Sequence, residues 1–206
     1  NRLWPKTISP DVKFFPYNNS IKAKNFTSGE IVFGLSIAYA LSGNTGLLDV
    51  AGMQGRVMIS AQGLQVARDH AIGKKTAFSR ESILLSDGPN GDEGAIAILR
   101  NGEPFKGQTL LFKFASQGMG HGHFDRLQYL FYDQGREIMS DYASARFVNV
   151  EPKFGGRYLP ENNTWAKQTI AHNTVTLNRT SHFNGRLAPA EEHAPSLILY
   201  KKDGNN

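Results

Sequence analysis

The chain has 206 residues and a formal charge of +5, and 40% of its residues are hydrophobic while 20% are charged. This length and composition allow a buried core in one ordinary domain or two small ones, and they exclude a disordered chain. The absence of cysteine excludes a disulfide scaffold, a thiolate nucleophile and a metal site built on sulfur.

The first third of the chain is predicted to be helical after an opening that contains three prolines. Ser28 is a candidate N-cap for a helix that starts near residues 29–30 and ends at residues 42–44, because apolar residues recur there with a helical period. Further helices are predicted from residue 45 and over residues 63–68. Short connections favour antiparallel packing of such helices.

From about residue 82 the apolar residues alternate with a period of two, which indicates an antiparallel sheet. A hairpin turn is expected at residues 133–135, with Gly135 at the position that needs a positive φ. The predicted strands cover residues 82–85, 95–99, 109–114, 127–132, 137–142, 174–177 and 197–200.

A long polar connection over about residues 143–172 holds several candidate functional residues, since structureless connections of this length tend to be functional or disordered. Tyr158 follows Arg157, and Arg146 lies upstream. A positive charge nearby favours tyrosinate, so Tyr158 is a candidate for proton transfer. The alternative is that its ring packs and its hydroxyl is hydrogen-bonded.

Two histidines in an HxH pattern, His121 and His123, precede a predicted strand and follow the flexible residues 118–120. In an extended chain their imidazoles share one face about 7 Å apart, which suits one metal ion, or one ligand and one catalytic group. Nitrogen and oxygen donors without sulfur favour zinc. An isolated HxH pattern is also compatible with a structural or surface position.

The spacing of the residues does not by itself identify the carboxylate that would complete such a site. Asp125 and Asp141 are the local candidates. A regular hairpin about Gly135 pairs Asp141 with Gln128 and places Arg146, rather than Asp141, opposite His123.

Four longer motifs stand out, at residues 118–125 (GMGHGHFD), 132–137 (YDQGRE), 141–147 (DYASARF) and 162–174 (NNTWAKQTIAHNT). With these motifs the sequence resembles the heparinase II/III-like polysaccharide lyases, and it looks most like the oligoalginate lyases of polysaccharide lyase family 17. The resemblance runs through nearly the whole chain.

The resemblance implies an α+β multidomain fold, with the C-terminal helices of an (α/α) toroid followed by an antiparallel β-sandwich, both incomplete. Residues 1–78 would end the toroid domain and its linker, and residues 79–206 would form a truncated sandwich. The family's active site lies in the cleft between the two domains. Because the chain starts at Asn1 rather than Met and ends after a predicted strand, we expect a fragment at both ends.

The resemblance also implies roles for single residues. The family's zinc ligands match His123, Asp141 and His172. This match favours Asp141 as the carboxylate ligand, although a regular hairpin does not place Asp141 opposite His123. We therefore expect the chain to bend or bulge between them. The zinc would be structural. The substrate-side histidine and the catalytic tyrosine match His121 and Tyr158, and Arg146 matches an arginine that holds the acidic sugar. The family's Asn-His pair and second tyrosine would lie upstream of Asn1, so the fragment alone is expected to be inactive.

The implied activity is exolytic β-elimination on alginate oligosaccharides, which releases an unsaturated uronate. The alternatives are a lyase for glycosaminoglycans of the heparin or heparan sulfate type and a non-catalytic carbohydrate-binding fragment. The expected partner is an acidic polysaccharide or oligosaccharide, with a homodimer as one assembly and a periplasmic or secreted location. We expect no nucleic-acid partner, and no apolar run approaches the roughly 18 residues of a membrane span.

Overall fold

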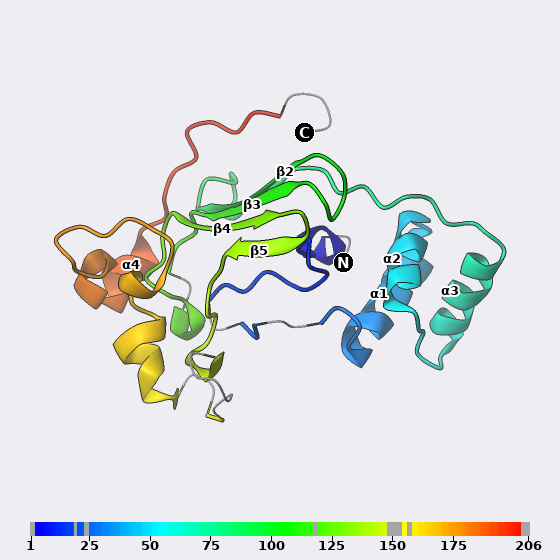
Figure 1. The fold of residues 1–206 in the computed structure, drawn as a ribbon, viewed down its shortest axis with the longest axis horizontal. Helices are drawn as coiled ribbons and strands as arrows, with labels where there is room; N and C mark the ends of the chain where they lie inside the picture. Colours follow the sequence, from blue (N-terminus) through cyan, green and yellow to red (C-terminus); the bar gives the residue numbers. More distant parts are fainter. Residues whose placement is uncertain are drawn as a thin grey trace. The chain divides into compact units, whose positions relative to one another are not determined.

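The helices of the first third are α1 (Gly29–Ser42), α2 (Gly46–Gln54) and α3 (Ala61–Ala71), in the computed structural model of the chain (Figure 1). The structure describes residues 3–18, 20–22, 25–117, 119–147, 154–155 and 158–202. The three predicted helices are confirmed. Ser28 has the extended backbone of an N-cap, but its hydroxyl accepts no capping hydrogen bond. None of the helices in the described ranges combines the length and apolar character needed to cross a membrane.

Apolar side chains and one polar link join these helices. Leu35, Leu47 and Val66 are buried, each with about 1% of its surface exposed. The Tyr39 hydroxyl of α1 donates to Asp69 Oδ2 of α3 at 2.7 Å. A buried carboxylate with a hydrogen-bond donor avoids the cost of an unmet charge, so this bond fixes the position of α3 on α1.

A five-stranded antiparallel sheet follows, with its strands in chain order (Figure 1). The strands are β1 (Ile83–Ser86), β2 (Ala95–Asn101), β3 (Gln108–Lys113), β4 (Gln128–Asp133) and β5 (Arg136–Met139). The predicted order of helices followed by an antiparallel sheet is therefore confirmed. Gly135 has a φ of +74° in the β4–β5 turn, as the sequence predicts.

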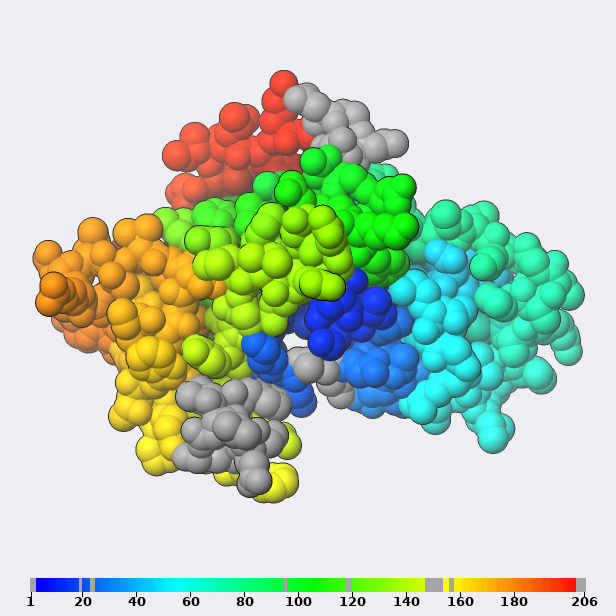
Figure 2. All heavy atoms as spheres, viewed as in Figure 1, coloured from blue at the N-terminus to red at the C-terminus, as the bar shows by residue number. Residues whose placement is uncertain are grey.

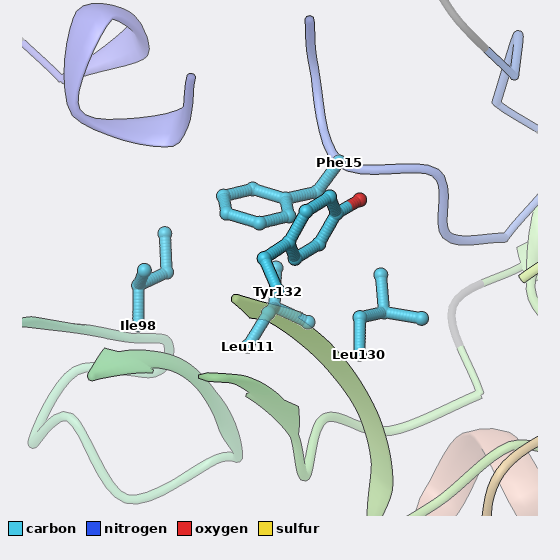
Figure 3. Close-up of a cluster of buried hydrophobic side chains, with 5 residues drawn as sticks. All are labelled: Phe15, Ile98, Leu111, Leu130 and Tyr132. Atoms are coloured by element: carbon cyan, nitrogen blue, oxygen red, sulfur yellow. The ribbon is translucent and has the colours of Figure 1, made fainter. Parts of the chain in front are cut away.

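The core of the sheet lies on the face that carries Ile98, Leu111 and Leu130, which are partners across β2, β3 and β4 (Figure 3). Phe15 covers this face, and its ring meets that of Tyr132 edge to face at 5.4 Å between centroids. Alternating apolar residues on three neighbouring strands bury one continuous surface, and this burial is the main stabilising contribution of the sheet.

Two predicted strands do not form. Residues 174–177 and 197–200 have no strand structure, and Leu177 makes only an isolated bridge with Thr180. Their apolar pattern is right for strands, but a strand also needs a neighbour with which to pair its backbone. Among the described residues the sheet ends at β1 and β5, so no second sheet of a sandwich is described.

Two compact units divide the chain. One comprises Asn1–Ile8, Val12–Phe14 and Lys24–Arg80, and the other comprises Ser9–Asp11, Phe15–Ala23 and Glu81–Asn206. The segment around Phe15 therefore belongs with the sheet that it covers. The domain boundary expected at residues 78–79 of the whole protein stays a prediction.

Short turns of helix run through the long connection after β5. They include η3 (Ala145–Phe147), the π-helical turn η5 (Asn162–Ala166) and η6 (Thr169–Ala171). The atoms of residues 158–185, yellow to orange in Figure 2, pack beside those of β4 and β5, yellow-green, where the Tyr129 backbone N–H donates to Asn173 O at 3.2 Å. The connection thus carries candidate residues to the sheet.

Candidate functional site

Two of the predicted histidines come together in the unit that contains the sheet. The ring centroids of His123 and His172 lie 5.2 Å apart. Both side chains are buried, with about 1% of their surface exposed. A carboxylate oxygen of Asp125 joins them, and one ligand atom from each of these residues lies within 4.8 Å of the others.

Asp141 is held against the same cluster by three donors. His172 Nδ1 lies 2.7 Å from Asp141 Oδ2. The Gln128 side-chain amide donates to the same oxygen, and the Ala143 backbone N–H donates to Oδ1. Three hydrogen-bond partners hold this buried carboxylate in one orientation.

A β-bulge explains how Asp141 reaches this position. Asp133 pairs with Arg136 and Tyr132 with Glu137, but Phe131 pairs with Met139, so one extra residue is inserted in β5. A bulge bends the strand and redirects the side chains that follow it. The regular hairpin register therefore fails before Asp141, as the family resemblance required, although the predicted proximity of Asp141 to Gln128 is retained.

His172 is positioned by a segment that is anchored at both ends. The Phe124 backbone N–H donates to Lys167 O at 2.8 Å, and Thr169 Oγ1 donates to Phe124 O at 2.5 Å. Beyond the histidine, Asn173 Nδ2 donates to Ser140 O at 2.7 Å. These bonds hold residues 167–173 beside the HxH loop and the end of β5.

The electrostatics of the cluster suit a metal ion. Burial, followed by the influence of His172, Lys113 and Lys167, lowers the pKa of His123 to about 2, so this imidazole is neutral at physiological pH. His172 Nε2 is buried and has no hydrogen-bond partner among the described residues. Two imidazoles beside a carboxylate form a nitrogen and oxygen donor set that fits zinc.

His121 differs from its neighbour in the HxH pattern. It ends the 3-10 turn η2 (Met119–His121) and is exposed, whereas His123 is buried. The expectation that an extended chain places both imidazoles on one face is therefore wrong, because the backbone turns here instead of continuing as a strand. Within the described residues, His121 is not part of the metal-type cluster.

The two other candidates lie on the connection after β5. The Arg146 guanidinium stands 5.4 Å from the centroid of the Phe154 ring. Tyr158 is 79% exposed, so its hydroxyl is accessible to a ligand from solvent. Gly118 and Arg157, which the sequence also singles out, lie outside the described residues.

Several residues of the site were not singled out by sequence reasoning. Lys113 Nζ lies 2.5 Å from Asp125 Oδ1 and 2.6 Å from Asn18 Oδ1, and Gln128 donates to Asp141. The sequence pattern could have pointed to Lys113, because this residue alternates with Thr109 and Leu111 on the inward-facing side of β3. A charged residue on that side indicates a buried partner.

A cavity of about 330 Å³ opens beside the cluster. Asp141, His172 and Lys22 line it, together with the aromatic side chains of Tyr142 and Trp165. A second cavity of about 500 Å³ lies elsewhere in this unit, around Arg126 and Phe183. The first cavity thus adjoins the Asp141–His172 pair, whose side chains are themselves buried.

Comparisons with known proteins add a family and two sets of relatives. A family model described as heparinase II/III-like, C-terminal, matches residues 84–205. An exo-oligoalginate lyase of Saccharophagus degradans is 49% identical over 91% of this chain and 25% of its own length. An alginate lyase of Stenotrophomonas maltophilia is 50% identical over 93% of this chain and 26% of its own length. The chain thus spans about a quarter of the curated relatives that it matches.

Solved structures agree in fold. A heparinase III gene product superposes with a TM-score of 0.60 at 18% identity, over 98% of this chain and 25% of that one. A heparan sulfate lyase from Pedobacter heparinus superposes with a TM-score of 0.56 at 18% identity, over 85% of this chain and 23% of that one.

Proposed function

The chain belongs to the heparinase II/III-like family, and from that membership we propose that it is part of an alginate lyase that acts exolytically on oligosaccharides. The family resemblance seen in the sequence is thereby confirmed. The observation that carries the proposal is the 49–50% identity to two relatives named as alginate lyases across more than nine-tenths of this chain. The similarity to heparan sulfate lyases at 18–19% identity extends to the fold alone.

The proposed reaction is β-elimination on a uronate. A base removes the proton at C5, and the electron pair forms the C4–C5 double bond as the bond from C4 to the glycosidic oxygen breaks. That oxygen takes up a proton, and the fragment on the reducing side carries the unsaturated ring at its new non-reducing end. The C5 proton is weakly acidic, so the neighbouring carboxylate has to be neutralised while the enolate develops.

Within this scheme we assign Tyr158 and His121 to the catalytic groups and Arg146 to substrate binding. The exposure of Tyr158 supports a role in proton transfer at C5 or at the leaving oxygen. The guanidinium of Arg146 is suited to pair with a sugar carboxylate.

We assign His123, Asp141 and His172 to a structural zinc site. The supporting observations are the burial of all three side chains, the 2.7 Å approach of His172 to Asp141, and the unmet His172 Nε2. When bound, zinc supplies a divalent charge that links the HxH loop, the end of β5 and the segment before residue 174.

The activity is tested with the full-length protein on alginate oligomers and on heparin. Elimination on alginate produces an unsaturated product with increased ultraviolet absorbance, and heparin should give none. Activity on heparin alone would replace alginate lyase with glycosaminoglycan lyase. Binding of alginate without any product would favour a non-catalytic carbohydrate-binding role.

The zinc site is tested by His172→Ala. The variant removes one ligand and leaves Asp141 without its partner, so the zinc content should fall well below that of the wild type, with a loss of about 3 kcal/mol in unfolding free energy. His193→Ala is the matched control, because His193 is exposed and its ring nitrogen Nδ1 lies 2.7 Å from Pro189 O, apart from the histidine cluster. Unchanged zinc by elemental analysis of His172→Ala would overturn the assignment.

We further infer a periplasmic or secreted location, since the alginate polymer from which the oligosaccharides derive lies outside the cytoplasm. Cell fractionation followed by an immunoblot tests this location, and recovery of the protein in the cytoplasmic fraction alone would contradict it.

A further inference from the structure

A lysine is buried at the end of β3, next to the histidine cluster. Lys113 lies on the inward-facing side of the strand, and only 2% of its side chain is exposed. Its ammonium contacts Asp125 Oδ1 at 2.5 Å and Asn18 Oδ1 at 2.6 Å. Because lysine is almost never fully buried without a partner, Asp125 is the group that allows this position.

Asp125 has a second oxygen that this pairing does not use. The residue is 1% exposed, and its Oδ2 is buried with no hydrogen-bond partner in the described part of the chain. The same holds for His172 Nε2. An acceptor and a ring nitrogen that both lack partners therefore belong to residues of one cluster, whose ligand atoms lie within 4.8 Å of one another.

We propose that the Lys113–Asp125 pair is part of the metal centre. Asp125 is a positioning residue that places negative charge within 4.8 Å of the histidine ligand atoms, and Lys113 holds Asp125 in place and offsets part of that charge. This inference rests on the zinc site proposed above. Carboxylates around metal-binding histidines commonly set the affinity for the metal, so their loss weakens binding.

The charges predict opposite effects for the two partners. Asp125 contributes negative charge, which favours a bound cation. Lys113 contributes a positive charge 2.5 Å from Asp125 Oδ1, which opposes a second cation close by. Removal of Asp125 should therefore weaken zinc binding, and removal of Lys113 should strengthen it.

The experiment is a zinc titration of the full-length protein against a chromophoric chelator, with melting temperatures measured in zinc and in excess chelator. Asp125→Asn should weaken zinc binding about 10- to 100-fold and reduce the difference between the two melting temperatures. Lys113→Met should strengthen zinc binding and enlarge that difference, because the metal then compensates a carboxylate that has lost its counter-ion. Equal zinc affinity in the wild type and Asp125→Asn, or shifts of the same sign in both variants, would overturn the inference.

Two further variants keep the result interpretable. If Lys113→Met does not fold, the double variant Lys113→Met/Asp125→Asn decides: it should bind zinc more tightly than Asp125→Asn alone, and weaker or equal binding would overturn the role of Lys113. Asp69→Asn is the matched control, because Asp69 is a buried aspartate bonded to Lys74 at 2.7 Å in the helical unit. It should lower both melting temperatures equally and leave zinc affinity unchanged.

The wild-type titration separates the two proposals. Absence of zinc binding by the wild type would overturn the metal centre and this inference with it. Zinc binding by the wild type that Asp125→Asn leaves unchanged would overturn this inference alone.

Discussion

Asp141 and Tyr158 represent two kinds of candidate residue in this chain. Asp141 is buried and receives hydrogen bonds from His172, Gln128 and Ala143, so its position is fixed by its neighbours. Tyr158 is 79% exposed on the long connection. A buried, fully bonded carboxylate suits a structural role, whereas an exposed hydroxyl suits contact with a substrate.

Substitution of Tyr158 tests the second role. In the full-length protein Tyr158→Phe removes the hydroxyl and keeps the ring, so the formation of unsaturated product should fall about 10²- to 10⁴-fold at an unchanged melting temperature. Tyr129→Phe is the matched control, since Tyr129 is also exposed and belongs to β4. Retention of most activity in Tyr158→Phe would contradict proton transfer by this residue.

At the scale of elements, the β4–β5 hairpin depends on its turn. Gln134 and Gly135 both have positive φ values, +48° and +74°, which match the twist of the flanking strands. A Cβ at Gly135 would lie 2.9 Å from the backbone oxygen of Phe105. The hairpin matters for the site because its bulge directs Asp141 toward His172.

We predict opposite effects for two glycine substitutions. Gly135→Ala should lower the unfolding free energy by about 1–2 kcal/mol, because alanine disfavours a positive φ and its methyl group meets a backbone oxygen. Gly34→Ala in α1 should raise it by about 0.5–1 kcal/mol, since no atom lies within 4 Å of the new Cβ. Urea denaturation measures both, and a neutral Gly135→Ala would show that the turn tolerates a side chain.

The link between α1 and α3 predicts a dependence on pH. Hydrogen bonds from Lys74 and then Tyr39 lower the pKa of Asp69 below its ordinary value. As the pH falls below about 4, the unfolded chain takes up a proton at Asp69 before the folded chain does, so this part of the stability is lost in acid. The difference in unfolding free energy between the wild type and Asp69→Asn, from urea curves at about pH 6 and about pH 3, should shrink in acid. An equal difference at both values would contradict the link.

At the scale of the whole molecule, the chain divides into a helical unit and a unit with the sheet, and the proposed metal residues all lie in the second. Their segments are already connected, because the Phe124 N–H donates to Lys167 O and Asn173 bonds Tyr129 through its carbonyl and its side-chain amide. A metal ion that joins three such segments would add to the stability of that unit by mass action, because the unfolded chain lacks a preformed site.

Removal of the metal should therefore destabilise mainly the segments that the metal joins. Treatment of the zinc-loaded protein with a chelator should increase amide hydrogen exchange at residues 121–125 and 167–173, while exchange in α1, α2 and α3 stays unchanged. Hydrogen exchange followed by mass spectrometry resolves these peptides. A uniform increase over both units would show that the metal stabilises the chain globally rather than through these segments.

The sequence by itself determined the helices, the five strands of the sheet and the turn at Gly135. Each depends on a local pattern, namely apolar period or a residue that tolerates a positive φ. It also supplied His123, Asp141 and His172 through long motifs shared with a family, although spacing alone left the carboxylate open.

Only the tertiary structure decided which groups meet. The bulge between β4 and β5 brings Asp141 to His172, and the burial of Lys113 brings Asp125 to the histidines. Residues 174–177 have the pattern of a strand but no strand beside them. In each case the deciding energy comes from partners distant in the sequence, through backbone pairing and the compensation of buried charge, which local patterns do not encode.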